Sequence, residues 1–479
     1  MLSFIQNVIS QCNSILWSYV LIGLLIVLGL YFTIKSNFVQ FKYFGHMFRL
    51  LGEGASNSIS SNNEEHKGVS SFQAFCISTA SRVGTGNLAG VAIAISLGGP
   101  GAVFWMWLIA LIGAGSSFVE STLAQIYKVK DKHGFRGGPA YYMEKGLNKK
   151  WMGVFFSILI TLSYGFVFNA VQANTITFAF EQAFGTKRLF VGIAITVCTA
   201  LIIFGGVKRI ARIVELIVPI MAIGYVTVAL FVVGKNFSQI PSIFALIIKS
   251  AFGFEQAIGG SIGATIMMGI KRGLFSNEAG MGSAPNAAAT ADVTHPVKQG
   301  FIQTLGVFTD TILICSATSF IILLSGSHLT KGLEGIQLTQ AALSSQVGSW
   351  GNTFIAICIL LFAFSSIIGN YYYGETNIEF LNGNIAWLTI YRFLVLAMVI
   401  FGSISKIQIV WDAADLFMGL MAVTNLIAIA KLSNIAFKAL KDYTKQRKDG
   451  KSPVFYADNI NGLNNLECWQ REKSEILDA

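Results

Sequence analysis

The sequence predicts an all-α polytopic membrane protein. Apolar residues make up 53% of the 479 positions and charged residues only 12%, about half the charged share of an average soluble domain. Apolar stretches long enough to cross a hydrocarbon layer, which takes about 20 helical residues, recur along almost the whole chain. Basic residues gather between those stretches, as in cytoplasmic loops. Together these observations predict about eleven transmembrane helices.

The expected spans begin close to the amino terminus. The apolar run from Ile15 to Ile34 has no small-residue cleavage site and no Lys or Arg before it, so we expect a retained helix instead of a signal peptide. The full set of expected spans is 14–34, 71–97, 101–127, 151–183, 187–206, 211–234, 254–290, 298–325, 347–372, 385–404 and 408–431.

Two of these spans are interrupted. Residues 81–90 (SRVGTGNLAG) and 269–285 (GIKRGLFSNEAGMGSAP) are polar and rich in Gly, unlike an ordinary spanning helix. With the first helix set aside, they fall in the first and sixth of the remaining spans, which gives an order of five plus five. An odd number of spans per half places the halves in opposite orientations, the pattern of an inverted repeat with a broken helix opening each half.

The predicted organisation therefore has four parts. They are an N-terminal transmembrane helix with a cytoplasmic linker (1–70), a first five-helix repeat (71–234), a second five-helix repeat (235–431) and a cytoplasmic tail (432–479). Basic residues concentrate in 128–150 and at the start of the tail, which lie on one side of this arrangement. We therefore expect a bacterial inner (plasma) membrane protein with its N-terminus outside and its C-terminus in the cytoplasm.

The net charge of +10 does not indicate a nucleic-acid partner, because the sequence has no folded basic domain with interleaved aromatic residues. Two sequence patterns resemble enzyme motifs, but each lacks the surrounding structure or partner residues that the motif needs. The glycines of 84–90 lack a βαβ unit, and the Gly259–Gly263 elbow-like pattern lies in a membrane span without a paired His or acid. We expect no enzyme and no cofactor, and the scattered cysteines indicate no disulfide framework.

Polar residues beside the glycines indicate what the interruptions do. Gly86 and Gly90 fit a helix-packing motif, but packing does not explain Thr85, Asn87 and Asn277. A helix broken at mid-membrane offers free N–H groups at the start of one half and free carbonyls at the end of the other. The amides suit a carboxylate, and the carbonyls suit a cation or an ammonium group. Two facing breaks predict a site for a zwitterion and a small cation.

Charged residues inside spans are costly and are functional candidates by default. Arg82 lies before the first break and Glu278 lies in the second, so a gating or structural ion pair between them is one interpretation. Lys271, Arg272 and Asp310 also lie inside expected spans. Glu120, Glu181 and Glu215 lie near span ends and are expected at the membrane interface.

Three long motifs resemble the alanine or glycine:cation symporter family. They are SFQAFCISTASRVGTGNLAGVAIAISLGGPGAVFWMW (71–107), FRGGPAYYM (135–143) and GIKRGLFSNEAGMGSAPNAAA (269–289). The likeness runs from about residue 68 to the tail. It implies the five-plus-five fold of sodium:neurotransmitter symporters, alternating access, and sodium-driven uptake of alanine or glycine.

The resemblance also implies site residues. By position, the substrate site falls on Thr85, Gly86, Asn87, Gln172, Phe275, Ser276 and Asn277. Amides at 85 and 86 would hold the carboxylate, Gln172 would be a hydrogen-bond partner, and Phe275 with the 276 backbone would enclose the ammonium and side-chain end.

The cation site implied by the same resemblance lies between the carbonyls of Ala80 and Val83 and the hydroxyls of Ser365 and Ser366. Such hard oxygen donors suit sodium. Many relatives have Thr at 366 and Trp at 370, where this chain has Ser366 and Asn370. The second difference predicts a roomier, more polar substrate pocket that accepts serine or a larger neutral amino acid besides alanine.

Two alternatives stay open. A proton-coupled symporter of serine, glutamine or another neutral amino acid would need a titratable group near the ion position, and the sequence places none nearer than Arg82. A channel would favour a continuous lined pore. The expected partners are a small neutral amino acid, sodium and the lipid bilayer, and the sequence indicates no particular oligomeric state.

Overall fold

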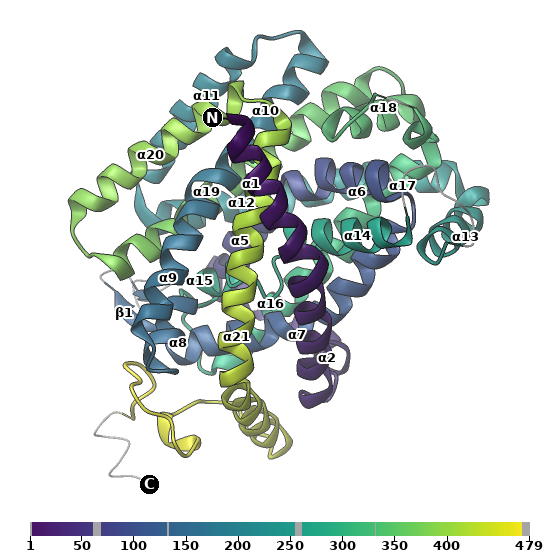
Figure 1. Ribbon diagram of the computed structural model, residues 1–479. Coiled ribbons are helices and arrows are strands. Elements are labelled where there is room, and N and C mark those ends of the chain that lie inside the picture. Colours follow the sequence, from purple (N-terminus) through teal and green to yellow (C-terminus); the bar gives the residue numbers. More distant parts are fainter. Residues whose placement is uncertain (1, 61–68, 132–133, 254–260, 331, 472–479) are drawn as a thin grey trace.

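The computed structural model describes residues 2–60, 69–131, 134–253, 261–330 and 332–471, and nearly all of them are helical (Figure 1). Within these residues, eight helices are long and apolar enough to cross a membrane, and Gly86–Gly98, Arg188–Ile203 and Phe237–Ala251 are shorter apolar helices. The predicted helical membrane fold is confirmed, with a short antiparallel hairpin of β1 (Val129–Asp131) and β2 (Gly134–Arg136) as its one addition among the described residues.

The helical elements follow the expected spans closely in most of the chain. In order they are α1 (Leu2–Ile15), η1 (Leu16–Leu21), α2 (Ile22–Lys35), α3 (Val39–Lys42), α4 (Phe44–Ser60), α5 (Ser71–Arg82), η2 (Gly86–Gly90), α6 (Val91–Gly98), α7 (Ala102–Ile126), α8 (Pro139–Lys145), α9 (Lys150–Ile160), η3 (Thr161–Phe168), α10 (Asn169–Phe184), α11 (Arg188–Ile203), α12 (Gly206–Lys235), η4 (Phe237–Gln239), α13 (Ile240–Ala251), α14 (Ile262–Asn277), α15 (Ala284–Ala288), α16 (Pro296–Val307), η5 (Phe308–Cys315), α17 (Ser316–Ser325), η6 (Ser327–Leu329), α18 (Ile336–Val347), α19 (Trp350–Leu381), α20 (Ile385–Ile404), α21 (Ile407–Lys448) and η7 (Ala457–Asn459).

The first predicted interruption is confirmed. Helix α5 begins with a capping box, in which Ser70 and Gln73 each accept a hydrogen bond from the other's backbone N–H at 3.1 Å. It ends at Arg82, because Val83 adopts an extended conformation (φ −81°, ψ 91°), and helical backbone resumes at Gly86. Backbone groups at the end of α5 and at the start of η2 therefore lack the partners of a continuous helix.

The second predicted interruption is also confirmed. Helix α14 ends at Asn277, and a turn with three left-handed residues follows before α15: Glu278 (φ 58°), Gly280 (φ 82°) and Gly282 (φ 85°). The expected span began at 254, but α14 begins at Ile262, and 254–260 lie outside the described residues. The assignment of two inverted repeats, 71–234 and 235–431, stays a prediction.

Two helices are longer than predicted. Helix α19 continues to Leu381, past the expected end at 372, and α21 continues to Lys448, past the expected end at 431. The sequence after 431 is polar overall, but Ala436, Ala439 and Tyr443 recur at helical spacing and are all buried. The charged part of the tail is therefore an amphipathic extension of the last spanning helix.

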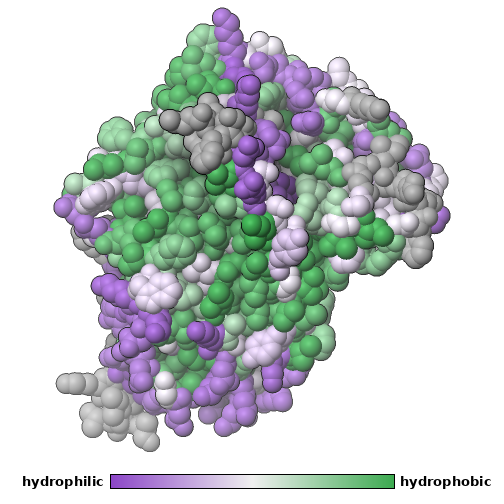
Figure 2. Space-filling view, viewed as in Figure 1, coloured by the Kyte–Doolittle hydropathy of each residue, from purple (hydrophilic) through white to green (hydrophobic). Residues whose placement is uncertain are grey.

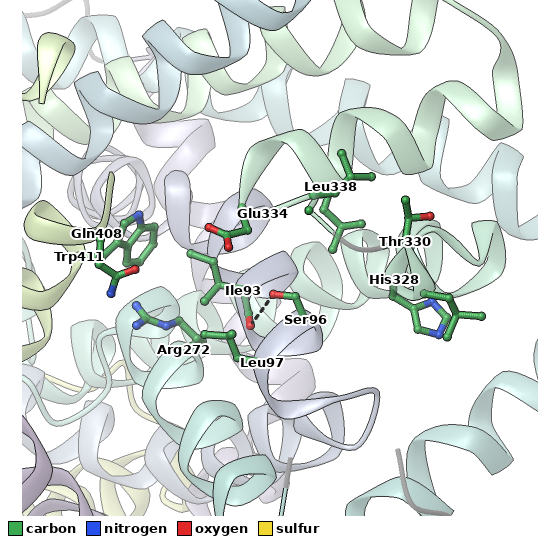
Figure 3. A pocket seen from close by; sticks show the side chains of 14 residues that line it. Ile93, Ser96, Leu97, Arg272, His328, Thr330, Glu334, Leu338, Gln408 and Trp411 are labelled. Atoms are coloured by element: carbon green, nitrogen blue, oxygen red, sulfur yellow. Dashed lines mark hydrogen bonds between the residues drawn. The ribbon is translucent and has the colours of Figure 1, made fainter. Parts of the chain in front are cut away.

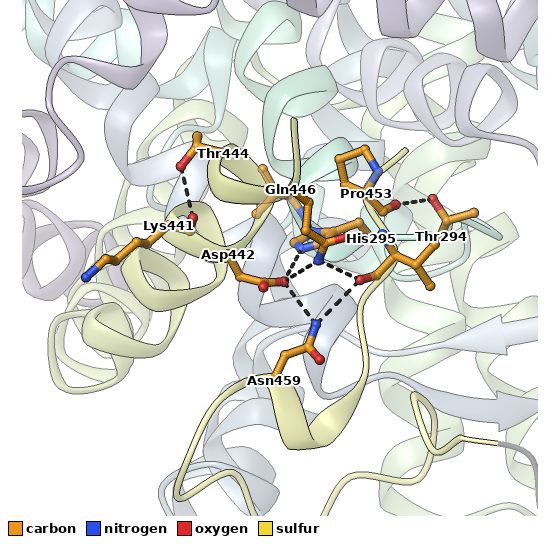
Figure 4. Close-up of polar contacts among 10 residues, drawn as sticks. Thr294, His295, Lys441, Asp442, Thr444, Gln446, Pro453 and Asn459 are labelled. Atoms are coloured by element: carbon orange, nitrogen blue, oxygen red, sulfur yellow. Dashed lines mark hydrogen bonds and ion pairs between the residues drawn. The ribbon is translucent and has the colours of Figure 1, made fainter. Parts of the chain in front are cut away.

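The rest of the tail packs on the loop before α16. The Phe455 N–H donates to Thr294 O (2.9 Å), and Asp442 accepts from Asn459 (3.1 Å) and lies 3.2 Å from the His295 ring nitrogen (Figure 4). Lys145 pairs with Glu467 at 2.9 Å, so the basic 128–150 segment and the tail lie at one end of the molecule. The amino terminus lies at the opposite end (Figure 1), and Figure 2 shows a broad hydrophobic region between these hydrophilic ends.

Candidate functional site

A side-chain amide from another helix accepts hydrogen bonds at the first break. Gln172 of α10 accepts through Oε1 from the Thr85 N–H (3.0 Å) and from the Thr85 hydroxyl (2.6 Å). Asn87 accepts from the Gly84 N–H at 2.8 Å. These side chains are at most 3% exposed. The structure therefore brings together Thr85, Asn87 and Gln172. The N–H groups of Gly84 and Thr85, just before η2, are bound by side-chain oxygens, the arrangement a carboxylate would satisfy.

Carbonyl oxygens of the same break meet a hydroxyl from α19. Ser366 Oγ lies 2.8 Å from Ala80 O, 3.4 Å from Val83 O and 2.9 Å from Phe362 O. A hydroxyl has one proton to donate, so this cluster holds more oxygen acceptors than donors and is suited to a hard cation.

Ser365 does not join this cluster. Its hydroxyl donates to Phe362 O at 2.8 Å and lies 3.7 Å from Met221 Sδ on α12. Adjacent helical residues point about 100° apart, so only one of the two serines can face the break. The structure thus separates Ser365 from the other three residues expected at the cation position.

The second break presses directly against the first. A Cβ added to Gly86 would lie only 3.1 Å from both Phe275 Cδ1 and Ser276 Cα, so the close approach of the two breaks favours glycine at this position. The Phe275 ring packs between Phe168 (4.9 Å between centroids) and Trp411 (4.8 Å). Every residue that the resemblance placed at the breaks is therefore buried where the two broken helices meet.

Asp310 links both breaks, which sequence reasoning did not anticipate. Its carboxylate accepts from Asn87 Nδ2 (2.6 Å), Ser276 Oγ (2.8 Å) and Thr311 Oγ1 (2.8 Å), and Asn277 Nδ2 donates to the same Thr311 hydroxyl (3.2 Å). An acidic residue in the middle of the apolar 298–325 span was the available signal. Asp310 is a titratable group between the two breaks.

Asn370 lies on the other side of the first break. Ser81 Oγ lies 2.8 Å from both Asn370 Oδ1 and Glu278 Oε1, and Ser283 donates to Glu278 Oε2 at 2.7 Å. The Asn370 Nδ2 group is buried and has no hydrogen-bond partner among the described residues. A buried amide donor without a partner is costly unless a ligand or water binds it.

The charged residues near the breaks have separate partners. Arg82 donates to Gln303 O (3.1 Å) and, in the described part of the chain, makes no ion pair with Glu278, so the paired interpretation is wrong for this conformation. Lys271 and Arg272 both contact Asp415 Oδ2 at 2.7 Å. Asp415 of α21 therefore pairs with both cations and balances one of their two charges.

Glu120 is fully buried, so the expectation that it lies at the membrane interface is wrong. It accepts from the N–H groups of Gly280 (3.0 Å) and Gly282 (3.1 Å) and from Asn425 Nδ2 (2.7 Å). The left-handed glycine turn of the second break directs these N–H groups inward, and Glu120 is the acceptor that satisfies them. Its role depends on residues far away in sequence, which the local pattern does not reveal.

An outer pocket of about 350 Å³ lies beyond the breaks (Figure 3). Arg272 and Trp411 line one end of it, with the Arg272 guanidinium carbon 4.6 Å from the centre of the Trp411 ring system. Because the Trp411 ring also packs on Phe275, these rings separate the pocket from the breaks.

Comparison with known proteins places this geometry in context. The model of the sodium:alanine symporter family matches residues 2–457. The chain is 60% identical over 469 residues to the "Probable sodium/glutamine symporter GlnT" of Bacillus subtilis, covering 98% of this chain and 97% of that protein. It is also 60% identical over 473 residues to the "Amino-acid carrier protein AlsT" of the same organism, covering 99% of each.

A likeness to a solved structure concerns the fold alone. The crystal structure of MhsT in complex with L-phenylalanine superposes with a TM-score of 0.52 at 15% identity, covering 77% of this chain and 97% of that chain. At this identity the likeness supports the expected fold of two broken helices and assigns no residue a role.

Proposed function

Since the chain belongs to the sodium:alanine symporter family, we propose that it imports a neutral amino acid with sodium across the plasma membrane by alternating access. The family resemblance inferred from the motifs is confirmed by this match. The observation that carries the proposal is the oxygen cluster of Ala80, Val83 and Ser366 beside the amide-rich start of η2. A cation site and an anion site lie back to back at one helix break.

Sodium binds, in this proposal, between the Ala80 and Val83 carbonyls and the Ser366 hydroxyl. The hydroxyl oxygen turns its lone pairs toward the ion, and its hydrogen toward Phe362 O, which lies 2.9 Å away. Ser365 faces α12 and takes no part. A bound ion at the end of α5 also neutralises the partial negative charge of free carbonyls there.

The amino acid binds across both breaks. Its carboxylate accepts from the Thr85 and Gly86 N–H groups. One carboxylate oxygen thereby takes the place of Gln172 Oε1, which accepts from the Thr85 N–H in the structure. Gln172 then donates to the carboxylate through Nε2. Its ammonium group lies against the backbone at Ser276, beside the Phe275 ring. Asn87 of the first break donates to Asp310, and Asn277 of the second break donates to Thr311. These two asparagines therefore position the site and do not bind the substrate directly.

Asn370 sets the substrate range. Its unpartnered Nδ2 can donate to a side-chain carbonyl, and Asn is a smaller side chain than the Trp that the family resemblance implies for many relatives at this position. We therefore extend the expected substrates, alanine and glycine, to glutamine, whose amide oxygen is a matching acceptor. The printed name of the GlnT relative is consistent with this extension.

Two substitutions of Asn370 test the substrate range. Asn370→Trp fills the space, so glutamine should no longer compete against labelled alanine, while glycine and unlabelled alanine should compete as before. Asn370→Ala keeps the space and removes the donor, so glutamine affinity should fall roughly tenfold with alanine affinity unchanged. Competition for uptake into proteoliposomes measures both. Equal glutamine competition in the wild type and both variants would show that position 370 does not set substrate size.

A second candidate function is proton coupling, and one observation favours it. Asp310 is a buried carboxylate that contacts residues of both breaks, so protonation there would alter their contact. Separate sodium and proton gradients decide between the two ions, as described in the final measurement below.

The proposed orientation places the amino terminus outside and the tail in the cytoplasm. In a background with the exposed Cys12 and Cys198 replaced by Ser, Lys149→Cys and Lys451→Cys should react with a membrane-impermeant maleimide only after the membrane is opened. Thr186→Cys, which lies on the other side, should react in intact cells. Labelling of position 149 or 451 from outside would overturn this orientation.

A further inference from the structure

A basic pocket of about 480 Å³ lies where α2 ends beside the C-terminal part of α21. Five lysines line it: Lys35, Lys42, Lys438, Lys441 and Lys448. No Asp or Glu is among its lining residues, and none of these lysines forms an ion pair within the described ranges. Like charges gathered in one concavity repel each other, so the pocket favours a bound anion.

Local structure explains why the lysines converge. Asn37 and Phe38 both adopt left-handed conformations (φ 55°), which reverse the chain after α2 and bring Lys42 back toward Lys35. On α21, Lys438, Lys441 and Lys448 lie on one stripe of the helix. Figure 4 shows Lys441 directed away from the contacts of Asp442 and His295, which occupy the inner side of the same helix.

The pocket lies at the end of an apolar helix long enough to cross a membrane. That segment, Asn7–Lys35, ends at Lys35, which lines the pocket, and the aromatic residues Tyr43 and Phe437 also line it. Tyr31 (39% exposed), Phe38 (53%) and Phe41 (49%) are exposed aromatic residues of α2 and of the segment that follows it. The Phe437 ring, which lines the pocket, lies 6.3 Å from the Tyr31 ring. Apolar and aromatic residues of α2 and α21 and the lysine-lined hollow therefore meet at one site.

We propose that this pocket binds the phosphate headgroup of an anionic phospholipid, with the acyl chains lying along the aromatic and apolar surface of α2. The ordinary excess of basic residues on a cytoplasmic face explains scattered lysines. It does not explain five lysines without ion pairs in the described ranges around one cavity at the end of an apolar spanning helix, with Tyr43 and Phe437 in its lining. This arrangement fits a lipid with a charged head and apolar chains. The inference does not depend on which substrate or ion is transported.

Native mass spectrometry of the full chain in detergent tests the proposal, with phosphatidylglycerol, cardiolipin and phosphatidylcholine as probes. The test variant carries Lys42→Gln, Lys438→Gln and Lys441→Gln. The matched control loses the same charge at exposed lysines outside the pocket: Lys149→Gln, Lys445→Gln and Lys451→Gln. Wild type and control should retain phosphatidylglycerol or cardiolipin, and the test variant should bind them at least about tenfold more weakly.

Three results would overturn the proposal. One is an equal loss of bound anionic lipid in the test and control variants, which would show that lipid binding depends on net charge alone and not on the pocket. Another is phosphatidylcholine binding as strongly as phosphatidylglycerol. The third is displacement of bound lipid by millimolar inorganic phosphate, which would assign the pocket to a soluble anion. Circular dichroism and the elution volume of each variant confirm that it is folded before binding is compared.

Discussion

Replacing Gly84 by alanine is expected to lower sodium-driven amino acid uptake about a hundredfold, because overpacking a buried position costs about 1–3 kcal/mol and here displaces binding groups directly. A Cβ on Gly84 would lie 2.9 Å from Gln172 Oε1 and closer still to Ser366 Oγ. The same methyl group would therefore push on the proposed carboxylate position and on the proposed sodium position at once. Initial uptake rates in proteoliposomes, normalised to the inserted protein, measure the loss.

Gly90 provides the matched control in the same helix region. A Cβ there would meet Thr85 O and Trp411 Cη2 at 3.8 Å and Arg272 Cδ at 4.0 Å, all ordinary contact distances. Gly90→Ala should therefore keep most of the activity. If the two alanine variants transport equally well, Gln172 and Ser366 do not form the binding groups at the first break. If both fail, the loss reflects helix packing in general.

Removing the Ser366 hydroxyl is expected to raise the sodium concentration needed for half-maximal uptake roughly tenfold, the effect of losing one buried polar ligand. Ser366 Oγ lies 2.8 Å from Ala80 O and is the hydroxyl that the structure brings to the carbonyls. Ser366→Ala should leave the maximal rate at saturating sodium largely intact, since the carbonyl ligands remain. Uptake of labelled alanine against increasing sodium gives both values.

Ser365→Ala is the control for this change, because it removes a hydroxyl of the same helix turn that faces Met221. Its sodium dependence should match that of the wild type. If the sodium concentration for half-maximal uptake rises in Ser365→Ala and not in Ser366→Ala, the ion lies on the α12 side of α19. Unchanged sodium dependence in both variants would move the ion away from this helix altogether.

Features encoded by local sequence could be predicted. The breaks at 83–85 and 278–283 follow from Gly and polar residues in otherwise apolar spans, because a lipid-exposed backbone must be satisfied within its own helix. The pairing of Thr85 with Gln172 also agrees with the positions carried over from the family motifs.

Features that depend on distant contacts could not be predicted. Nothing near Glu120 in sequence shows that it accepts from Gly280 and Gly282, and nothing near Asp310 shows that it bridges Asn87 and Ser276. The orientation of Ser365 could not be predicted either. Ser365 and Ser366 are adjacent and identical residues, and only the packing of α19 decides which hydroxyl faces the break. Residues 432–479 were expected to be partly helical, but their continuity with the last span, as one helix α21 to Lys448, was not predicted, because it depends on burial of Ala436, Ala439 and Tyr443 against distant parts of the chain.

Uptake driven by imposed ion gradients is the direct test of sodium-coupled symport by this protein. Purified protein is reconstituted into liposomes, and accumulation of labelled alanine and glutamine is followed under an inward sodium gradient or an inward proton gradient, each imposed alone. Under the sodium gradient, both amino acids should rise above the external concentration and fall back when a sodium ionophore is added. The proton gradient alone should give no accumulation. Accumulation driven by protons without sodium, or equilibration that never exceeds the external concentration, would show that the protein is not a sodium-coupled symporter.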